Sequence, residues 1–168
     1  HGFDGLRGVA RIFLIWLSDG DGVMQPISSV PKKLFEGKHS ELSAKIIKVF
    51  YEAHNELGYG FSEIIYLKAF KIALEAIGLK VDKQVPINVY FRGQMIGEYF
   101  ADLVVNDLIM LELKSVSQII DEHEAQLLNY LKSTEIEVGY VMNFGKSAIF
   151  KRKVFDNDRK GSLSWTKQ

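Results

Sequence analysis

The sequence contains no cysteine and only three prolines among its 168 residues. The lack of cysteine excludes disulfides, thiolate zinc sites and cysteine-held iron–sulfur clusters, and it fits a cytoplasmic protein. No apolar run approaches the ~20 residues that cross a bilayer, so no membrane partner is expected. Neither sign of charge is in excess, because lysine plus arginine and aspartate plus glutamate both number 21. Net charge therefore does not indicate a nucleic acid or a membrane as partner.

The composition is typical of one globular domain with a core. Hydrophobic residues make up 47% of the chain and charged residues 25%, which are ordinary values for soluble proteins. Residues 1–40 are predicted to be an N-terminal extension, in which 9–17 form a strand or an apolar docking segment. Residues 41–155 are predicted to form the folded domain, and residues 156–168 a polar tail that frays.

The spacing of apolar residues predicts an alternation of helices and strands. Glycines at 58 and 78 are expected to end the first two helices. The expected order is helix, helix, three strands in a meander, helix, strand, strand. This order indicates an α/β fold with a mixed sheet flanked by helices, αβββαβ. The expected helices cover residues 40–57, 62–77 and 119–132, and the expected strands cover 79–91, 99–105, 108–113, 136–143 and 148–155.

Three charged residues interrupt the second and third strands, which are otherwise apolar. Strand alternation places Glu112 and Lys114 on one face. Asp102 lies opposite Glu112 only if the two strands are joined by a three-residue loop or a bulge around residues 106–108. Charges inside core-like strands are costly unless they are paired or bind a metal. The sequence therefore predicts that Asp102, Glu112 and Lys114 converge.

Two carboxylates beside an amine suit a hard divalent cation such as Mg²⁺, whose preferred ligands are oxygens. A lysine beside such a cation can orient or deprotonate water and stabilise negative charge that develops on a phosphate. The alternative is an exposed aspartate and a surface Glu–Lys pair. The apolar surroundings on both strands favour the functional interpretation.

Two predicted helices carry further polar candidates on one face each. Glu63 and Tyr66 share a face of helix 62–77, and His123, Gln126 and Tyr130 share a face of helix 119–132. A glutamate in a first helical turn is also favoured by the helix dipole alone. The polar residues on helix 119–132 support the prediction of a functional site at the charged strands.

At these positions the sequence resembles a known family. Asp102 followed by Glu112-Leu113-Lys114 resembles the motif of the PD-(D/E)XK nuclease superfamily, with Ala101 where the nominal proline of the motif would lie. Residues 60–66 match the GxxExxY signature of one branch. Residues 123–131 resemble the HxAQLxxYL segment of that branch, which includes the QxxxY motif of exonuclease-like nucleases. The resemblance covers roughly residues 41–150 and implies a restriction-endonuclease-like core.

The resemblance also implies roles for individual residues. Asp102 and Glu112, with the carbonyl of Leu113, would hold Mg²⁺ or Mn²⁺, and Lys114 would act on the attacking water. Glu63 would supply a further carboxylate, either as a ligand or as a contact to a second metal.

Four other residues would support that site. Gln126 and Tyr130 would line it and contact the nucleic-acid backbone or brace the lysine. His123 and Tyr66 are secondary candidates, because each is equally suited to local packing or hydrogen bonding.

The function implied by the resemblance is metal-dependent hydrolysis of phosphodiester bonds in DNA or RNA, with DNA preferred as the partner. The alternative is a catalytically silent domain of the same fold that binds nucleic acid or another protein. A hydrolase for a small phosphorylated molecule is disfavoured, since the chain has no glycine-rich phosphate loop. The sequence is also compatible with a homodimer.

Overall fold

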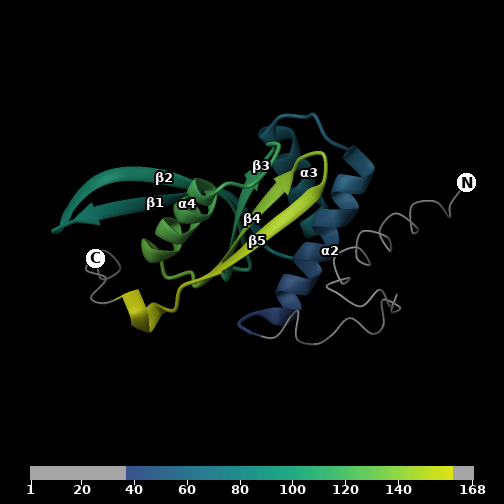
Figure 1. Ribbon diagram of the computed structural model, residues 1–168. Helices are drawn as coiled ribbons and strands as arrows, with labels where there is room; N and C mark the ends of the chain where they lie inside the picture. The colour runs from purple at the N-terminus through teal and green to yellow at the C-terminus, as the bar shows by residue number, and fades with distance from the viewer. Residues whose placement is uncertain (1–36, 161–168) are drawn as a thin grey trace, which may run out of the picture. The chain divides into compact units, whose positions relative to one another are not determined.

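The computed structural model describes residues 37–160 (Figure 1). The expected apolar segment at 9–17 and the end of the expected tail lie outside the described residues. The chain divides between Leu57 and Gly58 into two compact units. The described helix of the first unit is α2 (Ser40–Leu57), as predicted. Its first hydrogen bond joins the Ser43 N–H to the His39 carbonyl at 2.8 Å, so Ser40 is the first residue within the helix.

The second unit contains the remaining elements in the predicted order. Its polar segment after the last strand continues into a short 3-10 helix, η3, so the prediction that this segment frays is wrong for its first residues. The Lys160 ammonium fixes η3 by donating to the carbonyls of Thr134 and Ile136, each at 2.8 Å. The elements are α3 (Glu63–Ala76), β1 (Val81–Phe91), β2 (Gln94–Val105), β3 (Ile109–Lys114), α4 (Asp121–Lys132), β4 (Val138–Phe144), β5 (Ala148–Val154) and η3 (Asn157–Lys160).

One mixed sheet, in the order β1-β2-β3-β4-β5, forms the centre of this unit. Strands β1, β2 and β3 are antiparallel neighbours, β3 and β4 are parallel, and β5 returns antiparallel to β4. The parallel step requires a crossover, and α4 supplies it. Pro86 lies in β1, which is an edge strand, one of the positions where a sheet tolerates proline.

Helices α3 and α4 cover opposite faces of the sheet. From α3, Tyr66 stacks on Phe144 at 4.5 Å between ring centroids, and Phe70 meets the same ring edge-on at 5.7 Å. From α4, Leu127 lies against Gly139. Positions 139 and 144 in β4 differ by an odd number of residues, so they face opposite sides. The predicted sheet flanked by helices is confirmed.

The connection between β2 and β3 has the predicted odd length. Val105 pairs with Ile109, which leaves three residues in the loop. Asn106 and Asp107 both have positive φ, at 51° and 57°, and the Leu108 N–H donates to the Val105 carbonyl at 3.0 Å. Positive φ at both central residues is typical of a type I′ turn, and Leu108 is the additional residue. The resulting register aligns position 102 with position 112.

Strands β1 and β2 form a long hairpin that extends beyond the other strands (Figure 1). Its register is regular from Val81 to Lys83 and resumes at Val85, but Gln84 and Asp102 are not paired. Gln84 has a φ of 50°, in the left-handed region. The β1–β2 ladder is therefore interrupted directly beside Asp102.

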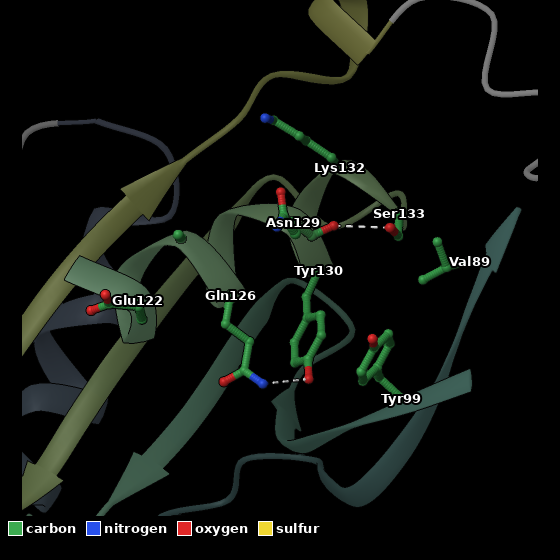
Figure 2. Close-up of a pocket in the computed structure, with 9 residues that line it drawn as sticks. Val89, Tyr99, Glu122, Gln126, Asn129, Tyr130, Lys132 and Ser133 are labelled. Atoms are coloured by element: carbon green, nitrogen blue, oxygen red, sulfur yellow. Dashed lines mark hydrogen bonds between the residues drawn. The ribbon is translucent and has the colours of Figure 1, made fainter. Parts of the chain in front are cut away.

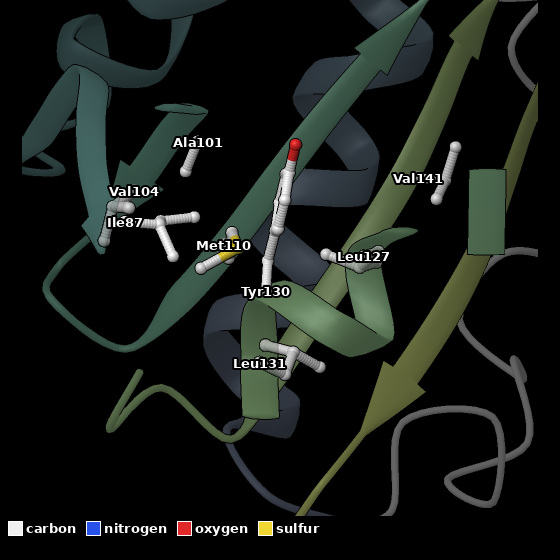
Figure 3. Packing of buried hydrophobic residues seen from close by; sticks show 8 residues of the cluster. All are labelled: Ile87, Ala101, Val104, Met110, Leu127, Tyr130, Leu131 and Val141. Atoms are coloured by element: carbon white, nitrogen blue, oxygen red, sulfur yellow. The ribbon is translucent and has the colours of Figure 1, made fainter. Parts of the chain in front are cut away.

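A buried hydrophobic cluster fills the space between α4 and the sheet (Figure 3). It joins residues of β1, β2, β3 and β4 to three side chains of α4. Because α4 packs through this cluster, its position fixes where its polar face lies relative to the strands. The members are Ile87, Ala101, Val104, Met110, Leu127, Tyr130, Leu131 and Val141.

Replacement of Gly139 tests the close approach of α4. A Cβ at this position would lie 2.8 Å from a Leu127 methyl and 3.2 Å from the Met110 carbonyl. We expect Gly139→Ala to lower the free energy of unfolding by about 1–3 kcal/mol, as other overpacked cores do. Gly97→Ala is the control, since its Cβ would meet only Tyr99, at 3.8 Å. Thermal unfolding measures both, and equal melting temperatures would contradict the predicted crowding.

Candidate active site

Asp102 and Glu112 face each other where the ladder between β2 and β3 ends. The last pair of that ladder is Leu103 with Leu111, and the next two residues are the two acids. The Leu113 N–H donates to Asp102 Oδ2 at 2.7 Å, and the Asp102 N–H donates to Glu112 Oε1 at 3.3 Å. Each carboxylate thus accepts a hydrogen bond from the opposite strand, in place of the ladder bonds.

Burial raises the pKa values of both acids above their ordinary values. Glu112 is 5% exposed, and burial, followed by the negative charge of Asp102, raises the pKa of Glu112 to about 8. Burial also raises the pKa of Asp102, against the effect of the Leu113 N–H, and the charge of Glu63 adds to the rise. The interaction between the two carboxyl groups lowers the pKa of Asp102 and raises that of Glu112. Glu112 is therefore the acid of the pair that favours its protonated form.

Lys114 and Glu63 complete the charged group. The Lys114 ammonium acts on both carboxyl groups and opposes the rise in their pKa values. Glu63 is exposed at the start of α3 and interacts electrostatically with Asp102. A hydrogen bond from Ser115 Oγ to the Phe61 carbonyl, at 2.9 Å, ties the approach to α3 to the end of β3. The structure thus brings the four predicted charged residues together.

Gln126 and Tyr130 lie on α4, and their side chains contact each other (Figure 2). Gln126 Nε2 donates to the Tyr130 hydroxyl at 2.9 Å. Tyr130 is 6% exposed. Burial, followed by the charge of Glu112, raises the pKa of Tyr130 to about 12. The Tyr130 hydroxyl therefore lies within electrostatic reach of the carboxyl pair, and Gln126 fixes its orientation.

Comparison with known proteins agrees with this geometry. A family model described as the PD-(D/E)XK nuclease superfamily matches residues 40–154. The chain belongs to the PD-(D/E)XK nuclease superfamily. Its mixed sheet with flanking helices is consistent with a restriction-endonuclease-like fold. Members of this superfamily typically depend on a divalent metal.

One solved structure, the crystal structure of SSO0001, is similar to this chain at 13% sequence identity with a TM-score of 0.46. The similarity covers 72% of this chain and 64% of the chain of SSO0001. No curated protein matches the sequence. Within residues 37–160, no helix is long and apolar enough to cross a membrane.

Two of the secondary candidates have local structural contacts. His123 Nδ1 accepts a hydrogen bond from the Ile120 N–H at 3.2 Å, which caps the start of α4. Tyr66 is fully buried, and its hydroxyl donates to the Gly58 carbonyl at 2.7 Å and accepts from the Phe61 N–H at 3.3 Å. Tyr66 therefore holds the loop that precedes Glu63.

Asn143 lies beside the candidate site and is not among the residues that the sequence predicts. It pairs with Lys114 in the parallel register of β3 and β4 and is 1% exposed. Its side chain accepts from the Val116 N–H at 3.0 Å and donates to the Val116 carbonyl at 2.9 Å. Asn143 therefore fixes the path of the chain just after Lys114. The available signal was an amide in an otherwise apolar strand.

The residues at the centre of the site suit the metal that the superfamily implies. Asp102, Glu112 and the Leu113 carbonyl are hard oxygen donors, as Mg²⁺ and Mn²⁺ prefer. The Leu113 N–H points to Asp102, and in an extended strand the carbonyl of a residue points to the same side. A bound cation would also relieve the repulsion that holds a proton on Glu112.

Glu63 is not close enough to Asp102 and Glu112 to form a group of three carboxylates around one metal ion. Among residues 37–160, no group of three or more histidine, aspartate or glutamate side chains is placed to hold a metal ion. The donors present are thus two carboxylates and one carbonyl. Water and substrate would have to supply the rest of the coordination shell, which is common for Mg²⁺.

The titration of Glu112 predicts how stability depends on pH in the metal-free protein. The pKa rises from its ordinary 4.5 to about 8 on folding, so the folded state binds more protons between these values. The free energy of unfolding therefore falls as pH rises from 5 to 8. Because one pKa unit is worth about 1.4 kcal/mol, the melting temperature in EDTA should fall on the order of 5–10 °C.

Glu112→Gln should remove most of this dependence of the melting temperature on pH. Glu98→Gln, at an exposed position on β2, should retain it. Addition of Mg²⁺ should flatten the slope of the unchanged protein, because the cation binds the deprotonated pair. Scanning calorimetry at pH 5, 6, 7 and 8 measures all three effects. Parallel slopes for Glu112→Gln and the unchanged protein would show that Glu112 does not carry the proton.

Proposed function

We propose that this chain is a metal-dependent nuclease that hydrolyses phosphodiester bonds of nucleic acid, with DNA as the first substrate to test. The observation that carries this proposal is the pair of carboxyl groups on β2 and β3, which exchange hydrogen bonds with the opposite strand. Burial, followed by the charge of Asp102, raises the pKa of Glu112 to about 8. A site of this kind is costly in a folded protein and is typical of functional positions. Lys114 follows two residues later on the same strand.

In this proposal Asp102, Glu112 and the Leu113 carbonyl hold the divalent cation. When bound, the cation lowers the pKa of a water ligand and stabilises charge on the phosphate. Lys114 orients the attacking water beside the scissile phosphate and donates to the oxygen that gains charge. Glu63 acts as a carboxylate at the rim of the site, where it contacts water or a second cation.

Tyr130 and Gln126 position the substrate. The Tyr130 hydroxyl is protonated at neutral pH, as is usual for tyrosine, and its pKa of about 12 extends this to alkaline pH. Gln126 donates to the hydroxyl oxygen, so the hydroxyl proton is left to donate to a phosphate oxygen. This pair thus holds the backbone of the nucleic acid against the carboxylates.

We further propose that the chain belongs to the GxxExxY branch of the superfamily. The support lies in the separate contacts of the signature residues. Gly60 has a φ of 107°, a conformation that favours glycine. Glu63 interacts electrostatically with Asp102. The Tyr66 hydroxyl bonds to the backbone of the loop that precedes Glu63. In this branch the signature would position one glutamate at the metal site.

Two substitutions separate metal binding from cleavage. Asp102→Ala should abolish both, because it removes a ligand. Lys114→Ala should keep Mn²⁺ affinity within a few-fold and reduce cleavage by about 10²–10⁴-fold, the usual range for a lost proton-transfer group. Calorimetric titration with Mn²⁺ and a plasmid-nicking assay measure the two properties. Lys71→Ala, on α3 and paired with Glu75, is the matched control and should behave like the unchanged protein.

The competing interpretation is a catalytically silent domain that binds nucleic acid or another protein. It predicts that the unchanged protein neither nicks plasmid nor shortens oligonucleotides with Mg²⁺ or Mn²⁺. Full cleavage by Lys114→Ala would instead show that this lysine is a structural counter-ion for the carboxylates.

A further inference from the structure

A pocket with a volume of about 570 Å³ lies between the β1–β2 hairpin and α4. Tyr99 and Val89 of the β1–β2 hairpin form one wall, and α4 with Ser133 forms the other (Figure 2). Tyr130 lines the pocket, and its hydroxyl is also within electrostatic reach of Glu112. The pocket and the candidate active site therefore share this one side chain.

The hairpin wall offers an aromatic ring for stacking. Tyr99 is 49% exposed, and its ring centroid lies 5.4 Å from that of Tyr130, with the rings inclined by 39°. In Figure 2 the two rings lie side by side below the polar face of α4. A planar aromatic ligand can stack on such a half-exposed ring, and every nucleobase has a suitable face.

The α4 side of the pocket offers amides. Asn129 is exposed and presents a carboxamide with both donors and an acceptor. Gln126 uses its Nε2 on the Tyr130 hydroxyl, which leaves its carbonyl oxygen as an acceptor at the pocket wall. Ser133 Oγ donates to the Asn129 carbonyl at 2.9 Å and so stabilises the helix end that carries this amide. Amides beside an aromatic ring suit the polar edge of a base.

The charges in the pocket disfavour a phosphate as its occupant. The lining contains one acid, Glu122, and one base, Lys132. The Lys132 ammonium lies over the Phe155 ring, 5.3 Å from its centroid. A phosphate site normally gathers several cations or backbone N–H groups. A neutral planar group with hydrogen-bonding edges is the better match.

We infer that the pocket binds one unpaired nucleobase, that of a nucleotide adjacent to the scissile phosphate. This inference rests on the proposed function. A base within a duplex is stacked on both faces and paired along its edge, so it cannot enter without leaving the helix. The substrates preferred by this site are therefore single strands and unpaired ends, rather than intact duplex.

The test scans one abasic position along a single-stranded DNA oligonucleotide, bound to the Lys114→Ala protein with Mg²⁺. Fluorescence anisotropy should show about a tenfold loss of affinity when the abasic position occupies the pocket, and little change elsewhere. In the Lys114→Ala background, Tyr99→Ala should lose about tenfold for the intact strand and become insensitive to the abasic position. Tyr99→Phe keeps the ring and should bind normally, which separates lost stacking from lost folding.

Phe91→Ala is the control, because Phe91 is an equally exposed aromatic (59%) on the same hairpin but does not line the pocket. It should retain full affinity and the full abasic effect. With the Lys114 side chain intact, the protein should also cleave single-stranded DNA at least tenfold faster, in kcat/KM, than a blunt duplex of the same sequence.

The outcomes distinguish the two proposals. Cleavage with no abasic effect at any position, or with equal rates on blunt duplex and single strand, overturns the base pocket and leaves the nuclease proposal intact. Position-specific abasic effects without cleavage by the unchanged protein overturn the nuclease proposal and support the pocket. Binding of a peptide or protein without any nucleic-acid binding overturns both.

Discussion

The burial of the Glu112 carboxyl group beside a second acid, Asp102, is the constraint on which this structure depends. Asp102 and Glu112 lie at the point where the antiparallel ladder ends, and each accepts a backbone N–H from the opposite strand. Those bonds and the Lys114 charge offset part of the cost of burial, yet the pKa of Glu112 still rises to about 8. The fold maintains an arrangement that is destabilising without a cation, which is typical of sites retained for function.

Polar contacts hold the chain just after β3, next to Lys114. Asn143 clamps the backbone of Val116, and Ser115 binds the loop held by Tyr66. On the opposite face, the missing side chain of Gly139 lets α4 approach the sheet. That approach carries Tyr130 and Gln126 toward the carboxyl pair. The catalytic proposal therefore needs three segments of the chain that are distant in sequence to meet within hydrogen-bonding range.

The proposed base pocket would add substrate recognition to the proposed catalytic site. Because Tyr130 both lines the pocket and interacts with Glu112, a substrate that stacks on Tyr99 would lie near the carboxyl groups that we propose as metal ligands. Stacking on an aromatic ring tolerates any base, and amide groups add modest discrimination. A site built in this way would favour exposed bases over a particular sequence. The long hairpin would then contribute to substrate choice through the aromatic wall that it supplies.

The sequence by itself determined the features that depend on near neighbours. Apolar spacing and the two terminating glycines predicted the elements, and strand parity predicted the odd-length loop that aligns Asp102 with Glu112. Tertiary structure decided the rest. The proton on Glu112, the clamp by Asn143, and the local bonds of Tyr66 and His123 each depend on burial and on partners outside the local pattern. The pocket likewise needs a hairpin and a helix from separate parts of the chain. Periodicity reports which way a side chain points along its own element, whereas its neighbours and its exposure to water are set only when the elements pack.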